Sequence, residues 1–406
     1  MRTASTALPA PKPLSLPDGR PAAGAWTLDP AIRHLNHGSF GAVPVAAQLV
    51  QDRLRREMLA SPVAWFSGLA RRVAAARAEI AESLGLDPDD TVLVPNASAG
   101  ASTVFAGLTL PAGGQAVVTD HGYGAVTMGA RRLARRYGGE VRTAHVPLDA
   151  DERTAFEAVA AELSDRTALI VVDHITSPTG RRMPVELLGV EAARRGVPLL
   201  VDGAHAPGLL RTPLAGLDCD FWIGNLHKFA CAPPGAALLV ARGPLREGLF
   251  PLIDSWGAED RYPARFDSQG TLDASAYLAA SAAFRFVEST WGWDTARDYM
   301  TELADFGAAV IAQAFTALTG QDHTAEVGMP VPALRLVRLP DGLASTREQA
   351  DALRDRVGRE LGAATAFTAF AGVGYLRLSA HVYNTAADYE DFAERCVPAL
   401  AQWARA

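Results

Sequence analysis

Lysine is almost absent from this sequence, and one of its two lysines stands where covalent chemistry is possible. All of the 38 basic residues are arginine except Lys12, in a Pro-rich N-terminal stretch, and Lys228, in the run Asn225-Leu226-His227-Lys228. A desolvated lysine amine can form an imine with a carbonyl compound, whereas arginine does not lose its proton to do so. Lys228 is therefore the candidate nucleophile, although a single loop lysine would ordinarily be read as a surface residue.

A second motif, Asp202-Gly203-Ala204-His205, closes the apolar run VPLLVD at residues 197–202. A carboxylate at the end of a buried strand is costly unless it pairs with a charge. The protonated pyridine nitrogen of pyridoxal 5′-phosphate (PLP) would be such a partner, since that pairing keeps the ring an electron sink. Taken by itself, Asp202 could equally be a helix N-cap.

Small residues fill the turn Asn96-Ala97-Ser98-Ala99-Gly100, between an expected strand and an expected helix. Small side chains let the backbone approach a ligand, and the free N–H groups of a helix start bind phosphate. The turn is therefore a candidate phosphate site, with a plain N-cap at Ser98 as the alternative.

Arg377 lies in an otherwise apolar strand pattern, RLS within YLRLS at 375–379. A buried guanidinium needs an acidic partner, and its two parallel N–H groups fit a carboxylate. The partner is either a substrate carboxylate, which we favour, or an acidic side chain in a structural ion pair.

The composition is that of a globular protein with 406 residues, 49% hydrophobic, and a formal net charge of −7. This charge gives no general attraction to nucleic acid or to an anionic membrane, and no apolar run is long enough to span a bilayer. The first 25 residues lack the apolar core of a signal peptide, so we expect a cytoplasmic protein. Three scattered cysteines (Cys219, Cys231 and Cys396) have no metal-ligand spacing, and we expect no metal site.

Short apolar runs alternate with helical patterns from about residue 90, which predicts a parallel sheet covered by helices on both faces. The expected strands are 91–95, 115–120, 140–146, 167–173, 197–202, 220–225 and 235–241, and the last would run antiparallel. Ligands bind beyond the carboxyl ends of the strands in such sheets, where the motifs above stand. After about residue 270, long helical patterns around 272–289 and 294–318 precede strands at 332–339 and 375–379, which predicts a smaller α+β domain.

Together these features resemble the class V aminotransferases, a family of fold-type I PLP enzymes, and in particular its isopenicillin N epimerase-like members. The segments that carry the likeness are LNHGSFGAVP (35–44), DHGYGAV (120–126), VDHITSPTG (172–180), VDGAHAPG (201–208) and RLSAHVYNT (377–385). The resemblance implies an α/β chain with the fold-type I PLP-dependent transferase fold: a large domain with a mostly parallel seven-stranded sheet, and a smaller α+β C-terminal domain. We expect a tail or arm over residues 1–25, the large PLP-binding domain over 26–268, and a linking helix with the small domain over 269–406.

The resemblance also assigns roles around the cofactor ring. Lys228 would form a Schiff base with PLP and then carry protons at the substrate α-carbon. Asp202 would pair with the pyridine nitrogen, and His205 would lie near the ring oxygen. His121 or Tyr123 would stack on the ring, and either could act as an acid or base.

The same resemblance assigns the remaining contacts. Backbone N–H groups of Ala97 and Ser98 and the side chains of Asn225 and His227 would hold the phosphate. Ser177 would stand where related enzymes contact the ring oxygen through asparagine. Asn36, His37 and Arg377 would bind the substrate, with Arg377 on its α-carboxylate. Thr271 would reach the neighbouring subunit's phosphate in a homodimer, unless it is simply the N-cap of the following helix.

The resemblance implies epimerisation at the α-carbon of an amino acid or an amino-acid-derived substrate. A PLP-dependent C–S lyase or aminotransferase of secondary metabolism is the alternative, and a catalytically silent PLP-fold binding protein is a third hypothesis. Residues 362–376 contain no cysteine, so sulfur transfer through a persulfide is not expected. No GxGxxG follows the early strands, which argues against a nicotinamide dehydrogenase.

Overall fold

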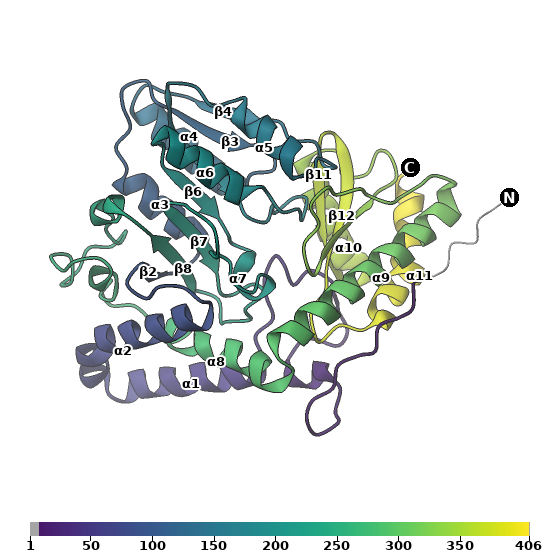
Figure 1. Ribbon diagram of the computed structural model, residues 1–406. Helices are drawn as coiled ribbons and strands as arrows, with labels where there is room; N and C mark the ends of the chain where they lie inside the picture. Colours follow the sequence, from purple (N-terminus) through teal and green to yellow (C-terminus); the bar gives the residue numbers. More distant parts are fainter. Residues whose placement is uncertain (1–7, 406) are drawn as a thin grey trace. The chain divides into compact units, whose positions relative to one another are not determined.

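The computed structural model describes residues 8–405, which divide into two compact units (Figure 1). The larger unit comprises Gly41–Ser177 and Arg182–Ser289. The smaller unit comprises the chain up to Phe40, the short segment Pro178–Arg181 and the chain from Thr290 onward.

The larger unit is built on a seven-stranded sheet with the strand order β2-β8-β7-β6-β5-β3-β4. Its strands are β2 (Thr91–Val94), β3 (Gln115–Thr119), β4 (Val141–Ala144), β5 (Thr167–Asp173), β6 (Leu199–Asp202), β7 (Phe221–Asn225) and β8 (Ala237–Ala241). β8 is antiparallel to both of its neighbours, and the remaining pairs are parallel. The prediction of a mostly parallel sheet of seven strands is confirmed.

Helices cover both faces of this sheet because its strands are apolar on both sides. Val118 and Leu200 belong to one core cluster with residues of α3 and α4, whereas Val117 and Val201 belong to a second cluster with residues of α2, α6 and α8. Successive side chains of a strand point to opposite faces, so a run such as TALIVVD must be covered on both faces of the sheet. The helices of this unit are α1 (Val45–Ala60), α2 (Pro62–Ser83), α3 (Ala97–Gly107), α4 (Gly124–Arg136), α5 (Glu152–Ala160), α6 (Val185–Arg195), α7 (Ala206–Leu209) and α8 (Ser275–Thr290).

The strand directions bring the predicted motifs of this unit to one edge of the sheet. β2, β3, β5, β6 and β7 all run the same way, since the one reversed strand, β8, separates β2 from β7. The segments that follow their carboxyl ends begin at residues 95, 120, 174, 203 and 226. This edge therefore carries every sequence motif of the larger unit except the segment around Thr271.

The smaller unit has a three-stranded antiparallel sheet with the order β11-β12-β9, and a two-stranded parallel pair, β1 with β10. Its elements are β1 (Arg33–His34), α9 (Trp293–Thr319), β9 (Leu334–Arg338), α10 (Arg347–Leu361), β10 (Ala363–Ala364), β11 (Ala366–Phe370), β12 (Val373–Ser379) and α11 (Ala386–Trp403). Two capping boxes, at Thr346 and Thr385, start α10 and α11.

The unit boundaries differ from the sequence prediction of 26–268 and 269–406. α8 belongs to the larger unit, because Tyr277 and its neighbouring alanines pack into the core below the sheet. The N-terminal segment belongs to the smaller unit, because Arg33 and His34 pair with β10. Such pairings join residues that are far apart in the sequence, so no local pattern reports them.

The predicted tail of residues 1–25 is described from residue 8 onward, and its first seven residues lie outside the described part. Within the smaller unit, the backbone carbonyl of Ser15 accepts a hydrogen bond from the Trp291 indole at 2.7 Å. Trp26 stacks on Trp291 with ring centroids 6.1 Å apart. The described part of this segment is therefore an arm held against the start of α9.

Among residues 8–405, no helix combines the length and the hydropathy that crossing a membrane requires.

Candidate active site

Lys228 and His205 lie together at the carboxyl edge of the large sheet. Lys228 follows β7 and His205 follows β6, two neighbouring parallel strands. The Lys228 amine nitrogen Nζ is 3.1 Å from His205 Nε2. The charged amine can donate to this imidazole nitrogen, so the histidine holds the lysine in place and can share a proton with it.

Asp202, the last residue of β6, is buried next to this pair. Its Oδ1 accepts the Ala204 amide at 3.0 Å, whereas its Oδ2 is buried and makes no hydrogen bond with any described residue. Burial raises the pKa of the Asp202 carboxyl, and the positive charge of Lys228 opposes that shift. A buried carboxylate oxygen without a donor is a costly feature, and a pyridinium N–H would satisfy it. The residues present here therefore fit PLP.

The phosphate motif sits at the start of α3. Asn96 caps the helix by accepting the Ala99 amide at 2.9 Å, so Asn96, not Ser98, is the N-cap. The Ala97 amide donates to Asn225 Oδ1 at 2.8 Å, which ties the end of β7 to this turn. The Ala97 amide, which was predicted to donate to phosphate, instead donates to Asn225 in this structure. The Ser98 amide remains as the backbone donor for an anion.

His227 lies beside the same turn in a fixed orientation. Its Nδ1 is 3.2 Å from the Ala236 carbonyl oxygen, so Nδ1 carries a proton and donates to that oxygen. Burial lowers the pKa of His227, and the charge of Lys228 adds to the shift. The neutral ring then offers Nε2 as an acceptor, and it becomes a donor to phosphate only after taking up a proton.

His121 and Tyr123, the two candidate stacking rings, differ in where they are held. His121 is fully buried, and its Nε2 donates to the Val146 carbonyl at 2.7 Å, in the segment that follows β4. β4 is three strands away from β6, whereas the Tyr123 amide is 3.4 Å from Asp173 Oδ1, at the end of β5 beside β6. The Tyr123 side chain is 45% exposed.

The sequence prediction missed Asp173, which ends β5 beside Asp202. The two residues are register partners on neighbouring parallel strands, and both side chains are buried. Backbone N–H groups of Tyr123 and Ser177 donate to the Asp173 carboxyl. The available signal was the pattern of two apolar strands that each end in aspartate, of which only the second was singled out.

Arg377 lies on β12 of the smaller unit and is buried. Its Nη2 donates to Asn36 Oδ1 at 3.2 Å and to Ser39 Oγ at 2.8 Å. Burial lowers the pKa of Arg377 to about 10, still far enough above neutrality that the group is charged. Asn36 and Ser39 thus orient the guanidinium through their side-chain oxygens.

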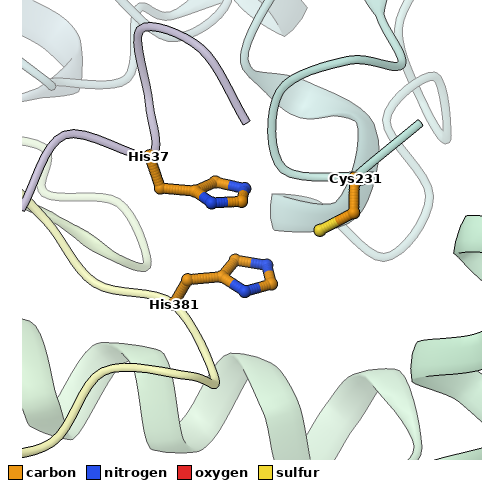
Figure 2. A group of neighbouring side chains, drawn as sticks. All are labelled: His37, Cys231 and His381. Carbon is orange, nitrogen blue, oxygen red and sulfur yellow. The ribbon is translucent and has the colours of Figure 1, made fainter. Parts of the chain in front are cut away.

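His37 belongs to an aromatic cluster of the smaller unit. Its ring stacks on that of His381, with centroids 3.9 Å apart and planes 13° apart, and Figure 2 shows the two imidazoles face to face. His37 Nδ1 is 3.1 Å from the Tyr383 hydroxyl. His37, His381 and Tyr383 thus form one buried aromatic cluster in the smaller unit.

Thr271 lies in an open groove of the larger unit with a volume of about 380 Å³. α8 begins at Ser275, and the Ser275 amide donates to the Asp273 carboxylate. Thr271 is therefore not the N-cap of that helix. Gln269 donates to the carbonyls of Leu93 and Phe266, which anchors the segment just before Thr271.

The structure thus groups the predicted residues into two sets within separate units. The larger unit holds, at one edge of its sheet, the set Ala97, Ser98, His121, Tyr123, Ser177, Asp202, His205, Asn225, His227 and Lys228. The smaller unit holds Asn36, His37 and Arg377.

Comparison with solved structures supports the predicted fold. The cystine C–S lyase C-DES in complex with cysteine persulfide matches 91% of this chain and 97% of its own, with a TM-score of 0.75 and 19% sequence identity. A cysteine desulfurase from Thermococcus onnurineus matches 95% of this chain and 98% of its own, with a TM-score of 0.72 and 19% identity. The prediction of the fold-type I fold is confirmed.

Comparison with curated sequences finds relatives of more than one activity. An isopenicillin N epimerase from Amycolatopsis lactamdurans is 31% identical over 91% of this chain and 95% of its own length. Another, from Streptomyces clavuligerus, is 33% identical over 74% and 79%. A probable L-cysteine desulfhydrase from Arabidopsis thaliana is 28% identical over 64% and 59%.

The family model for class-V aminotransferases matches residues 65–392, which include the Lys228, Asp202 and Arg377 motifs. The predictions of an enzyme and of PLP as its cofactor are confirmed by this match together with the donor set at the sheet edge. The chain therefore belongs to the class-V aminotransferase family.

Proposed function

We propose that this protein is a PLP-dependent enzyme that removes and returns the proton on the α-carbon of an amino acid or amino-acid-derived substrate, as an isopenicillin N epimerase-like enzyme would. The observation that carries the proposal is the group formed by Lys228, His205 and Asp202. An amine with an imidazole 3.1 Å away stands at the same sheet edge as a buried carboxylate oxygen that has no partner among residues 8–405. The two isopenicillin N epimerases that resemble most of this chain support the choice of reaction.

Bound PLP would withdraw electrons from the substrate α-carbon and so acidify its proton. Asp202 serves this chemistry by holding the pyridine nitrogen in its protonated form through Oδ2. The Ser98 amide, Asn225 and a protonated His227 hold the phosphate at the start of α3.

Lys228 is the base on one face of the substrate. Once its amine is free, it takes the α-proton at Nζ, and His205 keeps that nitrogen within hydrogen-bond reach and can share the proton. Ser177, which follows β5, stands on the same sheet edge and is a candidate contact for the ring oxygen.

Tyr123 is the candidate for the opposite face. Its backbone is tied to Asp173 beside β6 and its side chain is partly exposed, whereas the His121 ring is turned to the Val146 carbonyl. Tyr123 therefore suits both stacking on the cofactor and proton donation, and His121 serves to position the turn that carries it.

Arg377 is the candidate anchor for the substrate α-carboxylate. Asn36 and Ser39 orient its guanidinium, and burial makes an anionic partner worth more than it would be in water. His37 lies in the same loop as Asn36 and is a candidate for lining the substrate site.

A PLP-dependent C–S lyase is the second candidate, favoured by the desulfhydrase among the relatives. A persulfide-forming desulfurase is disfavoured because all three cysteines are buried. Burial raises the pKa of the Cys396 thiol to about 11 and that of Cys219 to about 12, and it raises the pKa of Cys231 as well. A protonated, buried thiol is a poor nucleophile.

The groove around Thr271 supports a homodimer as the active unit. Trp256, which lines the groove, is fully exposed, and Ile253, which lies beside the lining residue Gly270, is exposed as well. Apolar side chains gathered in this way on a surface mark an interface more often than they mark bare surface. Thr271 at this groove could then serve the partner's phosphate.

The test is to incubate the PLP-loaded protein with a panel of L- and D-amino acids in D₂O. Exchange of the α-proton for deuterium is followed by NMR, and inversion is followed by chiral chromatography. An epimerase exchanges the α-proton and yields both enantiomers without losing the side chain. A C–S lyase instead releases the 2-oxo acid, ammonia and a sulfur product from sulfur-containing substrates.

The chain supplies a matched control, since Lys12 is its other lysine. We expect Lys228→Ala to abolish exchange and the visible band that the bound cofactor shows before any amino acid is added, and Lys12→Ala to leave both unchanged. A wild-type protein that stays colourless with added PLP and exchanges no substrate proton would contradict the proposal. The hypothesis of a catalytically silent binding protein would then remain.

A further inference from the structure

Two carboxyl groups, not one, end the central strands of the large sheet. Asp173 on β5 and Asp202 on β6 are register partners in a parallel pair, so their backbones lie one strand spacing apart. Asp173 is 3% exposed and Asp202 is 2% exposed. A pair of buried carboxyls at this spacing cannot readily carry two negative charges.

The two carboxyls differ in what surrounds them. Asp173 accepts backbone N–H groups from two turns, those of Tyr123 and Ser177, and its Oδ1 is 3.4 Å from the Tyr123 nitrogen. Asp202 accepts the Ala204 amide with Oδ1, and its buried Oδ2 has no partner among residues 8–405. The chain itself thus satisfies Asp173 and leaves one oxygen of Asp202 for a bound group.

Charge balance separates them further. The pyridine nitrogen of PLP can pair with one carboxylate, and Asp202 is the one with an oxygen to offer. A second ionised carboxyl beside it would place two like charges in the same buried region, which is strongly unfavourable.

The titratable groups around Asp173 favour its neutral form. Burial, followed by repulsion from Asp202, raises the pKa of the Asp173 carboxyl well above its ordinary value. The two amide bonds and the charge of Lys228 oppose this shift with smaller effects. His174, the next residue, adds no positive charge, because burial lowers its pKa to about 3.

We propose that Asp173 and Asp202 hold one proton between them, and that this proton resides on Asp173. Asp202 alone then carries the negative charge. Asp173 is a neutral positioning residue, which fixes the Tyr123 and Ser177 turns. The inference rests on the proposed function only for the identity of the group that pairs with Asp202. The proton on Asp173 belongs to the apoprotein as well.

The first test reads that proton directly, without the cofactor. Infrared spectra of the apoprotein at neutral pH are recorded for the wild type and for Asp173→Asn, in H₂O and D₂O. We expect the difference spectrum to contain the C=O stretch of a protonated carboxylic acid, and to lose it when the wild type is titrated to alkaline pH. Absence of this band from the wild type at pH 7 would overturn the inference, whatever the protein's activity.

The second test compares three variants by their affinity for PLP and by the visible band of the bound cofactor. Asp173→Asn keeps a neutral carbonyl acceptor for the two amides, so we expect its PLP dissociation constant to stay within about threefold of the wild-type value. Asp173→Ala removes the acceptor, and losing two buried hydrogen bonds of about 1 kcal/mol each should weaken PLP binding by about tenfold or more. Asp202→Asn should weaken binding about as much and shift the band, since it removes a charge-assisted bond.

The outcome depends on which group is ionised. If Asp173 were the ionised partner, Asp173→Asn would be as damaging as Asp202→Asn, and the alanine variant would not be rescued by asparagine. If none of the proteins binds PLP, the proposed function fails, while the infrared result still decides the protonation of Asp173.

The third test is the pH dependence of the apoprotein's thermal midpoint. A carboxyl whose folded pKa is raised stays protonated in the folded state while the unfolded chain ionises above about pH 4. The wild type should therefore lose stability relative to Asp173→Asn as the pH rises from 5 to 8. The opposite trend would show a lowered pKa and contradict the inference.

Discussion

The charged side chains that the reaction would need are oriented by hydrogen bonds to other residues of the protein. Lys228 contacts the His205 imidazole, and Arg377 contacts the oxygens of Asn36 and Ser39. Asp202 keeps one buried oxygen without a donor among residues 8–405. Buried charged groups held in fixed orientations are costly to fold and are typical of binding and catalytic sites.

Replacing Arg377 by lysine tests its role toward the substrate carboxylate. Lysine keeps the charge but loses the planar pair of N–H groups, so a charge-assisted bond of about 1.5–3 kcal/mol is lost. We expect KM to rise by about 10- to 100-fold with a smaller change in kcat, since the contact is made equally in the ground and transition states. Steady-state kinetics of amino-acid turnover measure both constants.

Arg335→Lys is the matched control, because Arg335 lies on the neighbouring strand β9 and pairs with Asp305. It should leave KM unchanged. An unchanged KM in Arg377→Lys as well would assign Arg377 to a structural role.

At the scale of elements, Gly203, which directly follows β6, lets the backbone lie close to the Trp222 side chain of β7. A Cβ placed on Gly203 would lie 2.3 Å from the Trp222 indole, and Trp222 is fully buried. Neither group has room to move, because the indole packs in the core beneath the sheet. Gly203 directly follows Asp202, so a shift here would also displace the carboxylate.

Gly203→Ala should therefore lower both stability and PLP affinity. Overpacking of a core costs about 1–3 kcal/mol, and the thermal midpoint of the apoprotein should fall accordingly. Gly68→Ala is the control in α2 of the same unit, where a Cβ meets no atom within 4 Å. Removing a glycine from a helix interior should raise stability by about 0.5–1 kcal/mol. Equal midpoints for the two variants would show that the contact at Trp222 relaxes without cost.

At the scale of the whole molecule, the apolar rim of the Thr271 groove predicts a dimer. Trp256→Glu places a charge at the most exposed aromatic residue of that rim, and we expect it to convert the protein to monomers by light scattering after size exclusion. If Thr271 serves the partner's phosphate, the monomeric variant should also bind PLP more weakly.

Val190→Glu is the control for this experiment. Val190 is 67% exposed on α6 and does not line the groove, so a charge there should leave the oligomeric state unchanged. A wild-type protein that is monomeric at micromolar concentration would refute the dimer, and with it the role proposed for Thr271.

Much of this protein can be predicted from its sequence, because the relevant signals are local. A strand buried on both faces must be apolar throughout, so the strands of the large sheet are visible as runs, and the polar residues that end them mark the ligand edge. The only lysine outside the N-terminal arm identifies the covalent chemistry, since no other residue type in the run at 225–228 forms an imine.

Other features depend on contacts between distant residues and were decided by the tertiary structure. Asp173 is identified as a site residue only by the register of β5 with β6, which places it beside Asp202. The choice between Tyr123 and His121 depends on their contacts, since Tyr123 is bonded to the end of β5 and His121 to the segment after β4. The placement of residues 33–34 and of α8 in their units depended on strand pairing and core packing far along the chain. The sequence determined which chemical groups stand at the strand ends, and the fold decided which of them are neighbours, because electrostatic coupling between groups depends on their distance in space.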